Sequence, residues 1–294
     1  MDKLNKELIA AKDRLTEIEE KITALNIEST YLQDKLHLYF DSPKYNTTDT
    51  EKHIISSFWS SAYKKYKDGG YITNDDYISE VRFAYEMQLI NKIINEKCKK
   101  KLRAIDICCG NGRYTTEFAK KFDEIIGVDL SELRIKANNK ENKNKRIDFI
   151  NADFMSMSSS NIGTYDLVYV SDIFTYTDIE NVEKIFKRLL NLVSKNGILL
   201  IRESTMLIGY EDYKSKNYVA YYRNSRFYRK GLFKSYFNKS FRNYAYNLYH
   251  LEKYFNVNKA AKERVRDKPE LLKNIVKKSV NKNLRTCHFY VYKN

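Results

Sequence analysis

Apolar residues in the first part of the chain recur at alternating steps of four and three positions. The positions are Leu4, Leu8, Ala11, Leu15, Ile18, Ile22, Leu25, Ser29, Leu32 and Leu36, nearly five heptads with one polar interruption and Lys and Glu on the flanks. A helix packed against a domain would show a wider apolar stripe, so this pattern predicts a coiled coil. We expect residues 1–42 to form this helix, and residues 4–36 to join copies of the chain. Leu and Ile mix at both core positions, which leaves dimer and trimer open.

A helical pattern without strands occupies residues 43–100. Apolar and aromatic residues between His53 and Tyr66 share one helical face, and Gly69-Gly70 makes a turn. A second helix is expected over about 75–95. These helices form a segment of their own before the first strand.

Short apolar runs then follow, with the length and composition of buried strands. The first five end near Ile107, Asp129, Asp153, Asp172 and Glu203, and two more end near Val257 and Tyr292. Their order predicts an α/β fold with a doubly wound sheet.

The first two runs carry a nucleoside-binding pattern. A turn containing Gly110 and Gly112 follows the first run, and glycines let the backbone approach a ligand closely. Asp129 comes 23 residues after Asp106, where an acid at the tip of the second strand accepts both ribose hydroxyls. Thr115 replaces the third glycine of a dinucleotide site, and Asp106 suits a sulfonium and an amino group better than a pyrophosphate.

This pattern resembles motif I of the class I S-adenosylmethionine-dependent methyltransferases, acid-x-Gly-x-Gly-x-Gly, with Cys108 in place of the first glycine. The resemblance implies a Rossmann-like, seven-stranded methyltransferase sheet over residues 101–294, with residues 43–100 as a helical cap over the cofactor site. It implies S-adenosyl-L-methionine as cofactor, Asp129 on its ribose and Asp153 on its adenine amine. The expected cofactor-binding residues are Asp106, Cys108, Gly110, Gly112, Arg113, Asp129, Leu130, Asp153, Phe154 and Ser171.

Charge adds a candidate substrate element. The chain has 53 Lys and Arg against 38 Asp and Glu, a net charge of +15. Tyr213 to Leu251 contains no Asp or Glu and alternates basic with aromatic residues. We expect an inserted aromatic and basic helical element at about 205–250, suited to an acidic or phosphorylated glycan, to an anionic membrane surface, or less well to nucleic acid. The expected substrate-binding residues are Trp59, Tyr63, Tyr176, Arg202, Tyr222, Arg223 and Arg226.

Methyl transfer from a sulfonium is an in-line displacement that needs a base only for some acceptors. Asp172 and Glu203 end the fourth and fifth strands, where ligands gather, and His250 is a further candidate. Asp172 is the preferred base, although it can equally cap the next helix. Cysteine spacing gives no metal site. The start of the chain lacks a signal-peptide pattern, so we expect a cytoplasmic protein, with a peripheral position at the inner membrane face as the alternative.

A coiled coil joined to a methyltransferase domain is similar in architecture to bacterial enzymes that methylate the terminal sugar of a surface polysaccharide. This favours O-methylation of a sugar in an anionic glycan. The segment Phe58-Trp59 through Gly69-Gly70-Tyr71-Ile72 is also similar to enzymes that methylate protein amines, so a protein or peptide amine is the alternative acceptor. A non-catalytic coiled-coil assembly protein with a methyltransferase fold is the third reading.

Overall fold

The computed structural model describes residues 14, 15, 17, 18, 54, 55, 57–59, 76–157, 163–206, 210–214, 218–225, 227, 228, 239–243 and 285–293. The chain divides into two compact units, Met1–Lys44 and Tyr45–Asn294. In the first unit, Leu15 and Ile18 are 57% and 46% exposed. The coiled coil stays a prediction, because most of its positions lie outside the described residues.

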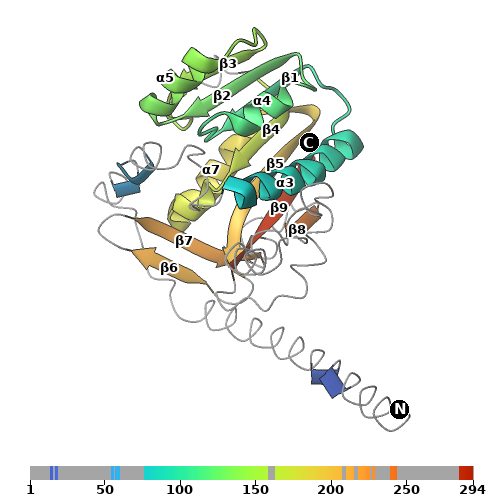
Figure 1. The fold of residues 1–294 in the computed structure, drawn as a ribbon, viewed down its shortest axis with the longest axis vertical. Helices are drawn as coiled ribbons and strands as arrows, with labels where there is room; N and C mark the ends of the chain where they lie inside the picture. The colour runs from blue at the N-terminus through green and yellow to red at the C-terminus, as the bar shows by residue number, and fades with distance from the viewer. Residues whose placement is uncertain are drawn as a thin grey trace. The chain divides into compact units, whose positions relative to one another are not determined.

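The second unit contains a nine-stranded sheet in the order β3-β2-β1-β4-β5-β7-β6, with β9 beside β5 and β8 beside β9 (Figure 1). The strands are β1 Arg103–Ile107, β2 Glu124–Asp129, β3 Ile147–Asn151, β4 Tyr165–Ser171, β5 Val193–Met206, β6 Glu211–Lys214, β7 Val219–Asn224, β8 Lys239–Asn243 and β9 Arg285–Lys293. The described helices are α3 Asp76–Lys97, α4 Arg113–Phe118, α5 Glu132–Glu141 and α7 Ile179–Asn191, with the short 3₁₀ helix η1 Phe174–Tyr176.

Strands β1 to β5 pair in parallel and β9 runs antiparallel to β5. The five apolar runs and the last run of the sequence therefore form the strands predicted for them, and the α/β fold is confirmed. The strand expected near Val257 lies outside the described residues. Parallel pairing brings the carboxyl ends of β1, β2 and β4 to one edge, where α/β proteins bind ligands.

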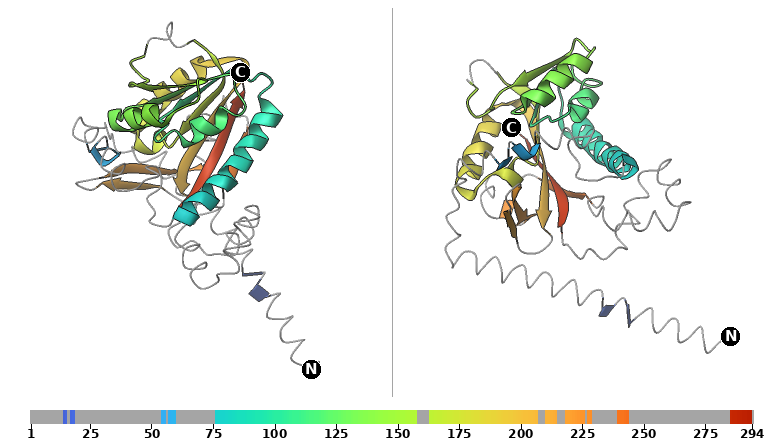
Figure 2. Two further views of the ribbon diagram at one scale, coloured as in Figure 1. Left: turned by 45° about the horizontal axis from the view of Figure 1, so that its top comes forward. Right: turned by 60° about the vertical axis from the view of Figure 1, so that its left-hand side comes forward.

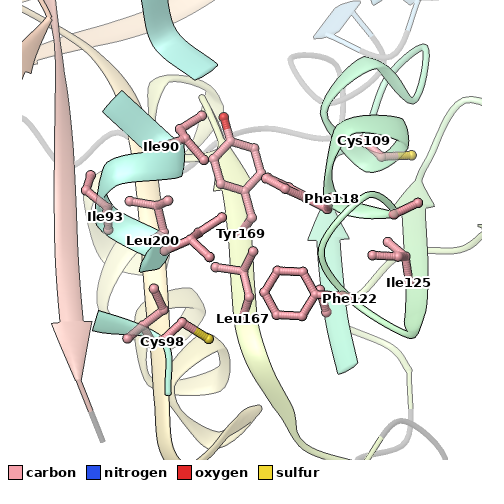
Figure 3. Packing of buried hydrophobic residues seen from close by; sticks show 14 of the residues in the cluster. Ile90, Ile93, Cys98, Cys109, Phe118, Phe122, Ile125, Leu167, Tyr169 and Leu200 are labelled. Atoms are coloured by element: carbon pink, nitrogen blue, oxygen red, sulfur yellow. The ribbon is translucent and has the colours of Figure 1, made fainter. Parts of the chain in front are cut away.

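Side chains of β4 alternate between two cores, as the pleat of a strand requires. Leu167 and Tyr169 pack in a cluster with Ile90 of α3 and Phe118 of α4 (Figure 3). Val168 and Val170 pack in a second cluster with α7. The right-hand view of Figure 2 shows the sheet between α3 and α7, so the structure has three layers.

The predicted helical insertion at 205–250 is wrong for most of its described residues, which form the end of β5 and the strands β6, β7 and β8, while residues 225, 227 and 228 are helical. Strand β5 pairs with β4 through residues 198–202 and with β9 along its other edge. Beyond the end of β4, Thr205 and Met206 pair with Arg223 and Asn224 of β7 instead. The β6–β7 hairpin therefore follows directly on the carboxyl end of β4, beside the ligand-binding edge of the sheet. No described helix is long and apolar enough to cross a membrane.

Candidate active site

The turn after β1 is built from left-handed backbone positions. Gly110 and Gly112 have φ angles of 57° and 72°, and Cys108 has a φ of 62°, which is uncommon for a residue with a Cβ. A Cβ on Gly112 would lie 2.6 Å from the ring of Phe149, so this position needs glycine for space as well as for φ. The turn thus keeps its shape with a cysteine in place of the first motif glycine, at some cost in backbone strain.

Asp129, at the tip of β2, holds this turn. One carboxylate oxygen accepts the backbone N–H of Gly110 at 2.9 Å and the other accepts the N–H of Ser131 at 2.8 Å. Each carboxylate oxygen has a further lone pair for a ligand hydroxyl. The Ser131 hydroxyl is buried at the same place, and the described residues give it no hydrogen-bond partner.

A cavity of about 350 Å³ opens at this edge of the sheet. Its walls include Ile55, Trp59, Cys108, Gly110, Arg113, Tyr114, Asp129, Leu130, Ser131, Arg134, Asp153, Phe154, Ser171, Asp172, Tyr176 and Arg202. Eight of the ten expected cofactor residues are among them, all except Asp106 and Gly112. The residues fit an adenosyl group, because a glycine turn, an acid with spare acceptor positions and the orphan Ser131 hydroxyl meet beside the apolar side chains of Leu130 and Phe154.

Asp106 does not line the cavity, so its expected direct contact with the cofactor is corrected. Its side chain lies beneath the turn and accepts the Thr115 hydroxyl at 2.6 Å. Burial raises the pKa of this carboxyl to about 7, although the hydrogen bond from Thr115 opposes the shift. Asp106 therefore supports the turn from below. Gly112 likewise acts through the shape of the turn.

Asp172 lies in the cavity wall as predicted, but both of its carboxylate oxygens are engaged. Oδ1 accepts the backbone N–H of Ser204 at 2.7 Å, and Oδ2 accepts the guanidinium of Arg202. The residue also has a φ of 56°, a left-handed position at the end of β4. A carboxylate held in this way is better suited to supply a fixed negative charge than to accept a proton.

Arg202 is buried and lies between two acids. Its Nε and Nη2 donate to Glu86 of α3, each at 3.1 Å, while Nη1 donates to Asp172. The hydroxyl of Tyr114 also donates to Glu86. Arg202 lines the cavity, as expected for a substrate-binding residue, but its polar atoms are committed to this network.

Three residues that were expected to act in the site lie outside the cavity and stabilise the fold. Glu203 is fully buried and accepts the backbone N–H groups of Phe174 and Thr175, which excludes a catalytic contact in this arrangement. Burial, followed by the charge of Asp172, raises the pKa of Glu203 well above its usual range. Arg223 donates to the carbonyls of Phe174 and Thr177 at 2.7 Å each, and thus ties β7 to η1.

Tyr222 is the third of these residues, and a chain of tyrosine hydroxyls connects it to the cavity. The hydroxyls of Tyr222 and Tyr218 lie 2.9 Å apart, and those of Tyr218 and Tyr176 lie 3.0 Å apart. Tyr176 lines the cavity and meets Trp59 edge to face at a centroid distance of 5.4 Å. His250, Tyr63 and Arg226 lie outside the described residues.

Sequence reasoning missed Arg134, Glu86 and Tyr114. Arg134 is 5% exposed, lines the cavity, and lies over Trp59 with its guanidinium carbon 5.2 Å from the ring centroid. Desolvation by burial lowers its pKa, although the charge of Asp129 opposes this. Arg134 shares the buried face of α5 with Ile135 and Asn138, but this polar helix has no apolar stripe that would have marked that face in the sequence. Glu86 lies in α3, and no local sequence pattern marks it as a residue of the site.

Comparison with known proteins agrees with this geometry. Residues 104–197 match the family model described as a methyltransferase domain. Residues 104–197 therefore form a methyltransferase domain, and the fold around them is that of S-adenosylmethionine-dependent methyltransferases.

Plant phosphoethanolamine N-methyltransferases are similar to part of the chain. Phosphoethanolamine N-methyltransferase 3 of Arabidopsis thaliana is 34% identical over 133 residues, which are 44% of this chain and 26% of that protein. A Triticum aestivum phosphoethanolamine N-methyltransferase is 32% identical over 129 residues, 43% of this chain and 26% of that protein. The chain thus spans about a quarter of the length of these relatives.

Solved structures extend the likeness in fold to most of the chain. A Leishmania major S-adenosylmethionine-dependent methyltransferase aligns with a TM-score of 0.57 at 14% identity, over 88% of this chain and 90% of that one. The N-methyltransferase NodS of Bradyrhizobium japonicum, in complex with S-adenosyl-L-homocysteine, aligns with a TM-score of 0.51 at 11% identity, over 81% and 98% of the two chains.

Proposed function

We propose that this protein transfers a methyl group from S-adenosylmethionine to an amine nitrogen. The observation that carries the proposal is a single cavity with the glycine turn and Asp129 at one place and the aromatic pair Trp59 and Tyr176 at another. The first group suits an adenosyl ligand. The second suits an acceptor that becomes a cationic, methylated amine, because aromatic faces attract such cations.

Two acidic and two apolar side chains of the protein would hold the cofactor. Asp129 would accept the ribose hydroxyls, Asp153 would accept the adenine amine, and Leu130 and Phe154 would flank the base. When bound, S-adenosylmethionine supplies a methyl carbon activated by a sulfonium. The protein then has to fix the acceptor in line with that carbon and to exclude water.

Tyr176 is the residue best placed to orient the acceptor. Its hydroxyl is hydrogen-bonded to Tyr218, whose hydroxyl is bonded to Tyr222. When Tyr176 donates along this chain, its oxygen lone pairs can accept an N–H of a neutral amine and direct the nitrogen lone pair. Burial, followed by the neighbouring tyrosines, raises the pKa of Tyr176 well above its usual range, so the residue acts as a neutral phenol.

The site favours an amine over a sugar hydroxyl as the acceptor, because neither of the two expected catalytic carboxylates is placed to remove a proton. A hydroxyl acceptor must lose its proton, whereas a neutral amine attacks with a lone pair it already has. Asp172 is held by Arg202 and Ser204, and Glu203 is enclosed away from the cavity. Arg223, which was expected to hold a glycan, instead donates to the backbone carbonyls of Phe174 and Thr177 and braces the fold. The plant relatives and NodS are N-methyltransferases by name, which also supports an amine.

A methyl-transfer assay tests the proposal. The full chain is incubated with methyl-labelled S-adenosylmethionine and, in separate reactions, with phosphoethanolamine, a peptide bearing a free α-amine, and an acidic oligosaccharide. We expect label in an amine acceptor, and a fall of about tenfold in kcat/KM for Tyr176→Phe with unchanged cofactor affinity. Tyr210→Phe, at a 45% exposed side chain, is the matched control. Label in the oligosaccharide alone would overturn the amine assignment and return the sugar as acceptor.

A further inference from the structure

The residues that follow β3 form a tight turn in the cavity wall. Residues 152–155 line the cavity, and among them Asp153 is the acid assigned to the adenine amine. The backbone N–H of Ser156 closes the turn by donating to the carbonyl of Asp153 at 3.0 Å. Oδ1 of Asp153 accepts the backbone N–H of Met155 at 2.9 Å. Within the described part of the chain, Oδ2 is therefore the oxygen that this turn offers to a ligand.

Arg188 of α7 holds the same turn from outside the cavity. Its Nε donates to the carbonyl of Phe154 at 2.9 Å, and its Nη2 donates to the carbonyl of Met157. The guanidinium carbon also lies 5.9 Å from the centroid of the Phe154 ring, within the range of a cation–π contact. A guanidinium is planar and its donors form a rigid fork, so two carbonyls bound to one such group are fixed relative to each other.

The helix that carries Arg188 is anchored in the core. Ile185, one turn earlier on the same side of α7, lines the cavity and packs in one cluster with Phe154. Val182 and Leu189 belong to that cluster and are 0% exposed. Arg188 therefore connects the turn to a helix that cannot shift without disturbing the packing of the core.

We propose that Arg188 is a positioning residue for adenine recognition, because it fixes the turn after β3 on α7 and thereby holds Asp153 against the amino group of the base. The inference rests on the proposed methyltransferase function and deepens it at the cofactor end of the site. Hypoxanthine has a carbonyl in place of this amino group and carries its N–H one ring position away. A fixed carboxylate cannot follow that N–H, whereas a carboxylate on a loose turn can, and then the two bases are no longer distinguished.

Titration calorimetry of the full chain with S-adenosylhomocysteine and with S-inosylhomocysteine, its hypoxanthine counterpart, measures the distinction as a ratio of dissociation constants. We expect the wild type to bind the adenosyl ligand at least about thirtyfold more tightly, because a hydrogen bond to a charged group is lost with the other base. Arg188→Met should lower this ratio about tenfold. Arg188→Lys keeps a donor but not the planar fork, so an intermediate ratio is expected. A residue that only stabilised the fold would weaken both ligands equally and leave the ratio unchanged.

Lys187→Met is the matched control, because Lys187 is the neighbouring residue of α7 and forms an ion pair with Glu183 at the exposed surface. In an Asp153→Ala background the ratio should be close to one, and adding Arg188→Met should not change it, because Arg188 acts through Asp153. A ratio near one in the wild type, or a ratio unchanged in both Arg188→Met and Arg188→Lys, would overturn the inference and leave the methyltransferase proposal intact. Failure of the wild type to bind either ligand would instead overturn the proposed function.

Discussion

At the scale of single residues, Gly112 shows how tightly the cofactor turn is specified. Its φ of 72° is a position that favours glycine, and a Cβ would lie 2.6 Å from Phe149, whose ring is itself packed in the core. We expect Gly112→Ala to lower the free energy of unfolding by about 2 to 5 kcal/mol, because backbone strain and overpacking add. Urea denaturation measures the change.

Gly163→Ala separates strain from packing in that experiment. Gly163 has a similar φ of 70°, but among the described residues its added Cβ would meet the far end of the long Arg103 side chain, at 3.0 Å, and no core residue. We expect a loss of about 1 to 2 kcal/mol, from backbone strain alone. Equal losses in both variants would show that Phe149 does not restrict the turn.

Asp106 gives stability a defined dependence on pH. Its pKa is raised from 3.8 to about 7 in the folded chain, chiefly by burial. Between these values the folded state binds more protons than the unfolded state, so the free energy of unfolding falls as pH rises from about 4 to 7 and then levels off. The loss attributable to this group is on the order of 2 to 4 kcal/mol.

Asp106→Asn should remove that slope, because an amide oxygen can still accept the Thr115 hydroxyl but does not titrate. Denaturation at a series of pH values compares the two proteins, with Asp148→Asn at an exposed position of β3 as the control. If the free energy of unfolding depends on pH in the same way in the wild type and in Asp106→Asn, another group is responsible for the dependence.

At the scale of elements, the sequence predicts the parallel sheet well and the acceptor side of the site poorly. Runs such as Asp166–Asp172 and Gly197–Glu203 are recognisable because strands buried on both faces are continuously apolar. Val219–Asn224 is just as buried, but it is rich in tyrosine and contains Arg223, so its composition pointed to a charged surface helix. Arginine is buried there because two backbone carbonyls accept from it.

Pairings between distant elements are the part that sequence could not provide. Glu86 and Arg202 are separated by 116 positions, and each lies in a segment whose local pattern is explained without the other. The cofactor-binding residues were predictable because the motif and the order of the strands together determine their positions. The positions of Arg134 and Glu86 in the site instead depend on how their helices pack on the sheet, which the sequence does not show.

The brace between β7 and η1 yields a prediction at this scale. Arg223→Met keeps the apolar stem but removes both hydrogen bonds to the turn that carries Tyr176. We expect the free energy of unfolding to fall by about 3 kcal/mol, and the KM for the acceptor to rise more than that for the cofactor. Lys136→Met, which breaks an exposed ion pair with Glu132, should leave the free energy of unfolding almost unchanged. A change confined to cofactor binding would contradict this role of the brace.

At the scale of the whole molecule, the heptad pattern predicts self-association. Leu15 and Ile18 occupy core positions of the predicted coil and are exposed in the single chain. We expect the full chain to sediment as a dimer or trimer, and Leu15→Asp with Ile18→Asp to sediment as a monomer, because charges at core positions oppose coiled-coil pairing. Glu17→Gln, on the flank of the same helix, should leave the mass unchanged. A monomeric wild type would refute the coil.

The claim on which the account depends is that the cavity at the tips of β1 and β2 binds the adenosyl cofactor through Asp129. Titration calorimetry of the full chain with S-adenosylmethionine tests it most directly, with Asp129→Ala and with Asp148→Ala as the control on the neighbouring strand. The account predicts one binding site per chain in the wild type and in the control, and an affinity lowered by at least about thirtyfold in Asp129→Ala, since hydrogen bonds to a charged group are lost. Equal affinity in all three proteins, or no binding by the wild type, would contradict it.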